Sequence, residues 1–108
     1  MTLIFYEVEE ITYKKSYKKI LDGKQIKKYH KQICKKYGVN TKLVINNKTF
    51  GYYDTDNNVI NVPENVTLGV LIHEIAHAYE FKHFDDTFHK NRLFQIINEM
   101  NIYAERVI

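Results

Sequence analysis

The chain has 108 residues, of which 44% are hydrophobic and 27% charged, with a net charge of only +3 and a single cysteine. This balance predicts one globular domain over residues 1–108 and excludes a disordered, fibrous or disulfide-stabilised chain. No apolar run approaches the ~20 residues that a bilayer requires, and the first residues lack the features of a signal peptide. Together with the lone Cys34, this predicts a cytoplasmic protein with no membrane partner.

Basic residues are concentrated towards the N-terminal end. Residues 11–45 hold eleven lysines and one acidic residue, Asp22. Such a region attracts polyanions, so a contact with DNA is expected through the lysine-rich segment 14–42. The alternative is an ordinary solvated helix face, because lysine is a good helix former that a surface tolerates.

The N-terminal elements are expected to be an extended segment and two helices. Residues 2–11 are expected to be extended or a short strand. Apolar residues at helical spacing predict a helix over Thr12–Leu21, which Asp22-Gly23 ends. A second helix is predicted over Lys24–Tyr37, because an apolar stripe is surrounded by lysines and Gly38 suits a left-handed C-terminal cap.

A β-rich block follows these helices. Strands are predicted over Lys42–Ile45, Thr49–Tyr53 and Val59–Val62, with Asn-rich and Asp-rich turns between them and Pro63 at the end. Short turns between consecutive strands predict a three-stranded antiparallel meander.

Two helices complete the chain. The first is predicted from Asn65 or Thr67 to Lys82, and the second from Phe88 to the C-terminus. Their inward residues are expected to be Leu68, Leu71, Ile72, Ile75 and Tyr79 in the first helix, and Leu93, Ile96, Ile97, Met100 and Ala104 in the second. The predicted fold class is α+β, with helices packed on one side of a small sheet.

The helix over residues 67–82 carries the sequence HEIAH, in which His73 and His77 are four residues apart and Glu74 lies between them. On a helix, side chains at this spacing lie one turn apart, so both imidazoles can reach one zinc ion at ~2.0–2.1 Å. Glu74 projects beside them and can accept a proton from metal-bound water. The pattern predicts a catalytic zinc site, although a pair of structural histidines would give the same letters.

A catalytic zinc ion usually has three protein ligands, so a further residue is needed. His83 has the spacing of a metzincin ligand, but Glu80 stands where metzincins have a glycine that turns the chain, which makes His83 a second-shell or alternative ligand. His89 is the preferred third ligand, because it falls in the first turn of the last predicted helix. Glu99 and Glu105 of that helix are further alternatives.

The stretch from HEIAH through FDDTFHKNRLF resembles the core of the SprT-like zinc metallopeptidases, the group that includes the Spartan proteases. The resemblance covers about residues 38–101. It implies that His73, His77 and His89 bind zinc and that Glu74 is the catalytic base. Two features depart from the family pattern, since Lys90 follows His89 where glycine is common and the chain lacks a zinc ribbon.

The resemblance implies a minimal zincin-like fold and a zinc-dependent endopeptidase that acts on protein or peptide substrates, including DNA-associated proteins. An extended substrate is expected to pair with Val59–Val62 if that strand forms the sheet edge. The oxyanion donor stays open among Tyr52, Tyr53, Tyr103, His83 and Arg92. The alternative function is a non-catalytic, zinc-stabilised module that binds nucleic acid or protein.

Overall fold

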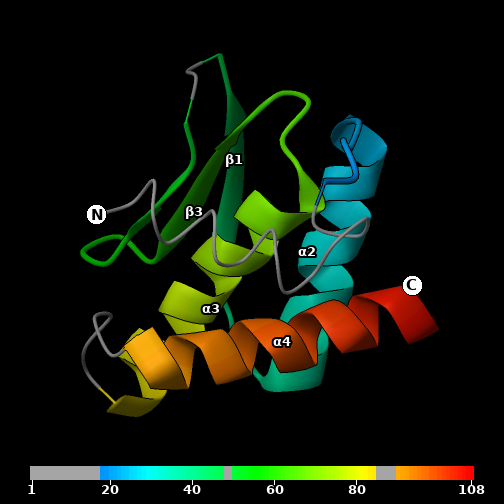
Figure 1. The fold of residues 1–108 in the computed structure, drawn as a ribbon. Coiled ribbons are helices and arrows are strands. Elements are labelled where there is room, and N and C mark those ends of the chain that lie inside the picture. The colour runs from blue at the N-terminus through cyan, green and yellow to red at the C-terminus, as the bar shows by residue number, and fades with distance from the viewer. Residues whose placement is uncertain (1–17, 48–49, 85–89) are drawn as a thin grey trace.

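The computed structural model describes residues 18–47, 50–84 and 90–108, which form three helices and a three-stranded sheet (Figure 1). The strand or extended segment expected over residues 2–11 lies outside the described residues, as does most of the helix expected over Thr12–Leu21. Its last four residues are described, and they are not helical. Ile20 instead bridges Thr67, and the Leu21 amide donates to the Val66 carbonyl at 2.9 Å.

Helix α2 spans Gly23–Tyr37 and starts one residue before the predicted helix. Its start is fixed by a capping box, in which Asp22 accepts from the Gln25 amide at 2.8 Å and the Gln25 side chain accepts from the Asp22 amide at 3.0 Å. Its end is fixed by Gly38, whose φ of 68° belongs to the left-handed region that glycine adopts without strain. Both predicted boundaries are therefore explained by local chemistry.

The sheet contains β1 (Lys42–Asn46), β2 (Tyr52–Asp54) and β3 (Val59–Pro63) in the order β1-β3-β2. Strand β3 runs parallel to β1 and antiparallel to β2, so the prediction of an antiparallel meander was wrong. Only β2 and β3 form a hairpin, and Asn58 in its turn has a φ of 56°.

The central position of β3 follows from its burial. Ile60 and Val62 are both completely buried, whereas the other two strands contain no fully buried residue. Strands β1 and β2 lie two strand spacings apart, or about 10 Å, a distance that the five residues between them in the chain are long enough to span. A short connection between two strands therefore did not make them neighbours.

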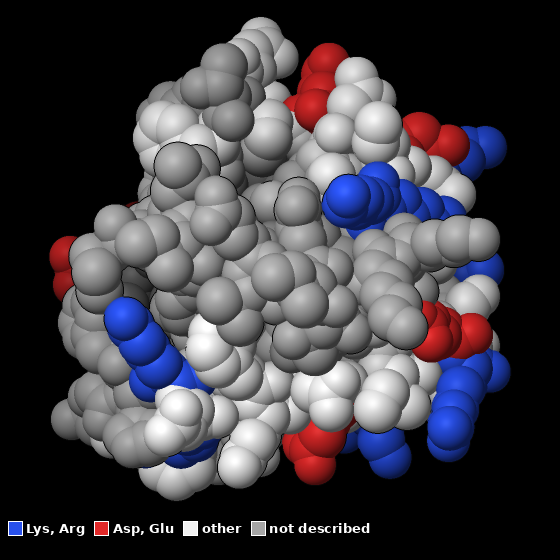
Figure 2. Space-filling model, viewed as in Figure 1, with Lys and Arg blue, Asp and Glu red and all other residues white. Residues whose placement is uncertain are grey.

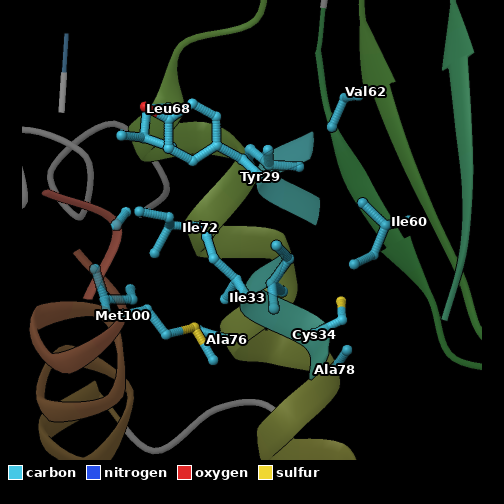
Figure 3. Close-up of a cluster of buried hydrophobic side chains, with 14 of the residues drawn as sticks. Tyr29, Ile33, Cys34, Ile60, Val62, Leu68, Ile72, Ala76, Ala78 and Met100 are labelled. Carbon is cyan, nitrogen blue, oxygen red and sulfur yellow. The ribbon is translucent and has the colours of Figure 1, made fainter. Parts of the chain in front are cut away.

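Helix α3 (Leu68–Phe84) lies at the centre of the domain, where it packs against the sheet, against α2 and against α4 (Lys90–Val107); α2 also contacts β1 (Figures 1 and 3). All five inward residues predicted for α4 are buried, and four of the five predicted for α3 are; Tyr79 is partly exposed. The predicted start of α4 at Phe88 lies outside the described residues. Among the helices described, none is long and apolar enough to cross a membrane.

Candidate metal centre

Helix α3 is buried on almost every side, which distinguishes it from an ordinary amphipathic helix. Its apolar residues Leu71, Ile72 and Ile75 have no exposed surface, but His73 is only 5% exposed and Glu74 only 4%. We expected the two histidines to lie away from the apolar stripe. His73 and Glu74 do so without reaching the surface, whereas His77 is half-buried, so the centre of the motif lies in a largely water-excluded environment.

The imidazoles of His73 and His77 converge. Their Nε2 atoms are 2.8 Å apart, and their ring centroids are 4.4 Å apart with the rings nearly perpendicular. Burial lowers the pKa of His73 to about 4, because the surroundings disfavour the charged imidazolium. His73 is therefore neutral at physiological pH, which is the state in which an imidazole binds a metal.

This arrangement fits a zinc ion. Two imidazole nitrogens that bind the same tetrahedral zinc at ~2.0–2.1 Å are about 3.3 Å apart. The observed Nε2 separation of 2.8 Å is within about half an ångström of that value, a change that small side-chain rotations supply. His73 and His77 would therefore hold the metal through Nε2.

The stripe of α3 that carries His77 faces the edge strand β2. Val70, His77 and Phe81 follow one another at seven and four residues, so they lie within about 40° of one another around the helix. A Cβ on Gly51, just before β2, would come within 3.2 Å of the Val70 Cγ1 atom. The Phe81 ring packs edge-on against Tyr53 of β2 with centroids 6.3 Å apart. The His73–His77 pair thus lies on the side of α3 that β2 flanks.

The condition that Val59–Val62 forms the sheet edge, on which its pairing with a substrate depended, is not met. These residues belong to the central strand β3, which is paired on both sides. Among the described strands, β1 and β2 form the edges, and β2 contacts α3. The edge next to the histidines is therefore Tyr52–Asp54.

His83 lies on another side of the helix. Helix α3 continues without a break through Glu80 to Phe84, so His83 is rotated by about 240° from His77. The side chain is exposed, and its ring packs on Tyr79 with centroids 4.3 Å apart. The structure therefore does not bring His83 to His73 and His77.

The preferred third ligand, His89, lies outside the described residues. Within the described ranges, no three His, Cys, Asp or Glu side chains lie close enough together to hold a metal ion. Glu99 and Glu105 are both exposed on α4 and do not join the two histidines in such a group.

Sequence reasoning missed a buried ion pair between the two C-terminal helices. Glu80 is completely buried, and its Oε2 atom accepts from the Arg92 Nε at 2.8 Å. The Arg92 guanidinium also lies 3.9 Å from the centroid of the Phe84 ring. A signal was present, because Glu80 is seven residues after His73 and shares its side of the helix. The pair joins the end of α3 to the start of α4.

The structure separates the candidate oxyanion donors. Tyr103 packs against Tyr37 of α2, at a centroid distance of 6.3 Å, and so lies on the side of α3 away from β2. The Tyr53 hydroxyl donates to the Asn58 Oδ1 at 2.8 Å, and Arg92 donates to Glu80. Tyr52 directly precedes Tyr53 along β2, so its side chain projects from the opposite face of the strand.

Comparison with known proteins adds no assignment: no protein-family model, curated protein or solved structure matches this chain.

Proposed function

We propose that this protein is a minimal zinc-dependent endopeptidase. The observation that carries the proposal is the convergence of the His73 and His77 Nε2 atoms, 2.8 Å apart, on a buried helix that also carries Glu74. Burying an imidazole and a carboxylate on one helix costs free energy, so simple packing does not explain this pattern. Zinc binding accounts for the pair of histidines, and catalysis accounts for the adjacent glutamate.

In this proposal each residue of the motif has a distinct task. His73 and His77 hold zinc, which when bound lowers the pKa of a water molecule towards ~7 and polarises the carbonyl of the substrate. Glu74 takes a proton from the attacking water and passes it to the leaving amine. Its burial keeps the carboxylate in a setting of low dielectric, where its interactions with nearby charges are strong.

The substrate is proposed to bind as an extended peptide along β2. Strand β2 is a three-residue edge next to the α3 stripe that carries His77, so a peptide added to this edge would pass beside the metal pair. Backbone hydrogen bonds to an edge strand bind a peptide with little dependence on its sequence. This arrangement suits the hydrolysis of unfolded or extended protein segments.

His89 is the proposed third zinc ligand. Arg92 follows His89 by three residues and donates a hydrogen bond to Glu80. Glu80 lies about one helical turn beyond His77, so this contact holds the start of α4 near the end of the motif. The resemblance of HEIAH and the following residues to SprT-like metallopeptidases supports the same assignment, and membership of that family is part of the proposal.

The third ligand is tested by the zinc content of purified variants. We expect His89→Ala to lose stoichiometric zinc, whereas His83→Ala, its matched control on exposed surface, keeps one zinc per chain. Loss of zinc from His83→Ala alone would overturn the assignment of His89.

The catalytic role is tested with Glu74→Gln, which preserves side-chain size and removes the base. We expect this variant to keep zinc but to cleave a denatured protein substrate about 10²- to 10⁴-fold more slowly than wild type. Unchanged cleavage would remove Glu74 from the mechanism. Zinc binding with no cleavage by wild type would favour the alternative, a zinc-stabilised binding module.

A further inference from the structure

Helix α2 carries a straight row of exposed lysines. Its sequence contains six lysines and no acidic residue. At about 100° per residue, four of them lie within about 60° of one another, and a fifth, Lys27, lies beside them. All five are exposed, and we call them the lysine row: Lys24, Lys27, Lys28, Lys31 and Lys35. Figure 2 shows most of the Lys and Arg side chains in view on the side where α2 runs.

The lysine row lacks internal compensation. None of its five side chains makes an ion pair or hydrogen bond within the described part of the chain. Like charges three or four residues apart on a helix destabilise it by about 0.2–0.5 kcal/mol per pair. A helix that needed lysine only for solubility would gain stability from alternating glutamates, which α2 does not contain. The uncompensated charge therefore indicates an external anion.

We propose that the lysine row binds the phosphodiester backbone of double-stranded nucleic acid without regard to sequence. From Lys24 to Lys35 the helix rises by about 16 Å. One strand of a duplex presents about five phosphates over that length, since their spacing along the axis is 3.4 Å. Five lysines thus face a matching number of phosphates.

The rest of α2 argues against an anionic membrane as the partner. A helix that binds a membrane surface inserts an apolar face between the headgroups. The apolar residues of α2 are already used, because Ile26 and Ile33 are completely buried and Tyr29 and Cys34 nearly so (Figure 3). The exposed residues of α2 are lysines with Gln32 and Gly23, so α2 offers a partner no exposed apolar side chain.

An acidic protein is a poorer match for the same surface. Protein interfaces are enriched in aromatic residues and arginine and depleted in lysine at their centres. The exposed residues of α2 include no aromatic side chain and no arginine. The absence of a stacking side chain within the row also predicts contacts to phosphates rather than to bases.

The lysine row and the metal pair lie on different sides of the molecule. Helix α2 packs on α3 through Tyr37 and Tyr79, whose ring centroids are 6.0 Å apart, and Tyr79 is rotated by about 160° from His77. A nucleic acid on α2 would therefore leave the β2 edge accessible. This inference does not depend on peptidase activity.

The test is the salt dependence of binding, measured by fluorescence anisotropy with 20-base-pair duplexes of DNA and of RNA. With five phosphate contacts, the logarithm of the association constant should fall with the logarithm of salt concentration with a slope of about −4.5. The double variant Lys28→Gln/Lys31→Gln should bind at least about tenfold more weakly at low salt and reduce the slope by about 2. Comparing the two duplexes identifies which nucleic acid is preferred.

The matched control is Lys36→Gln/Lys82→Gln, which removes the same charge elsewhere. Lys36 lies off the row against the Tyr103 ring, at 5.8 Å, and Lys82 donates to the Gly38 carbonyl. We expect this control to change affinity by less than about threefold, because distant charges are screened by salt. Equal losses in the two double variants, a wild-type slope shallower than −1, or tighter binding to phosphatidylserine vesicles would overturn the proposal.

Discussion

Helix α2 exposes its charged side chains to solvent, whereas helix α3 buries several of its own. In α2 every lysine is exposed and the four buried residues are Ile26, Tyr29, Ile33 and Cys34. In α3 the buried set includes His73, Glu74 and Glu80. Burying polar and charged groups costs free energy, so the residues of α3 require an explanation beyond packing. The exposed lysines of α2 require a reason for being gathered on one face.

The largest effect on this comparison is expected from Glu80, the most deeply buried charge of α3. Glu80→Ala leaves the Arg92 guanidinium without its carboxylate partner and should lower the free energy of unfolding by about 3 kcal/mol. Urea unfolding measures the change. The control, Glu99→Ala on the exposed face of α4, should shift it by less than about 0.5 kcal/mol. Equal losses of unfolding free energy in Glu80→Ala and Glu99→Ala would mean that the Glu80–Arg92 ion pair does not stabilise the fold.

A smaller effect is expected from the protonation of His73 in the metal-free protein. The pKa of His73 is about 4 in the folded chain and 6.5 in the reference state, so the unfolded chain binds the proton more readily between these values. Its contribution to stability is complete above about pH 6.5 and is lost as the pH falls towards 4, by about 2 kcal/mol between pH 7 and pH 5. Urea unfolding at pH 7 and pH 5 should show a steeper loss for wild type than for His73→Gln. Parallel losses would contradict the burial of a neutral imidazole.

The smallest effect separates the two faces of α2. Ile33→Val removes one buried methyl group and should lower the free energy of unfolding by about 1 kcal/mol. Lys31→Ala on the lysine row should change it by less than about 0.5 kcal/mol, and the removal of like-charge repulsion can make the sign favourable. Thermal unfolding of both variants measures the contrast. A larger loss from Lys31→Ala would show that the row stabilises the fold itself.

Local signals predicted α2, α3 and α4, because their determinants lie within a few residues of each boundary, whereas the described end of the helix predicted over Thr12–Leu21 is not helical. Asp22 and Gln25 form the cap at the start of α2, and Gly38 forms the cap at its end. The helical spacing of apolar residues likewise predicted the buried face of α4. These features need no knowledge of the rest of the chain.

The sheet order and the burial of α3 depend on distant contacts. Turn residues between β1 and β2 indicated a reversal of the chain, but the pairing of β3 between them is set by its fully buried Ile60 and Val62. In the same way, HEIAH predicted a pair of metal ligands from the spacing within one helix. The ion pair between Glu80 and Arg92 joins residues twelve apart on two helices, so the spacing within one helix does not reveal it. Helical periodicity describes one helix at a time and does not identify its partner.

The most direct test of the central claim is a zinc titration of the metal-free protein by isothermal calorimetry. We expect wild type to bind one zinc ion per chain and His77→Ala to lose this binding, because one of the two converging Nε2 atoms is removed. His83→Ala, which changes an exposed ring packed on Tyr79, should bind zinc as wild type does. Absence of zinc binding by wild type, or unchanged binding by His77→Ala, would contradict the account.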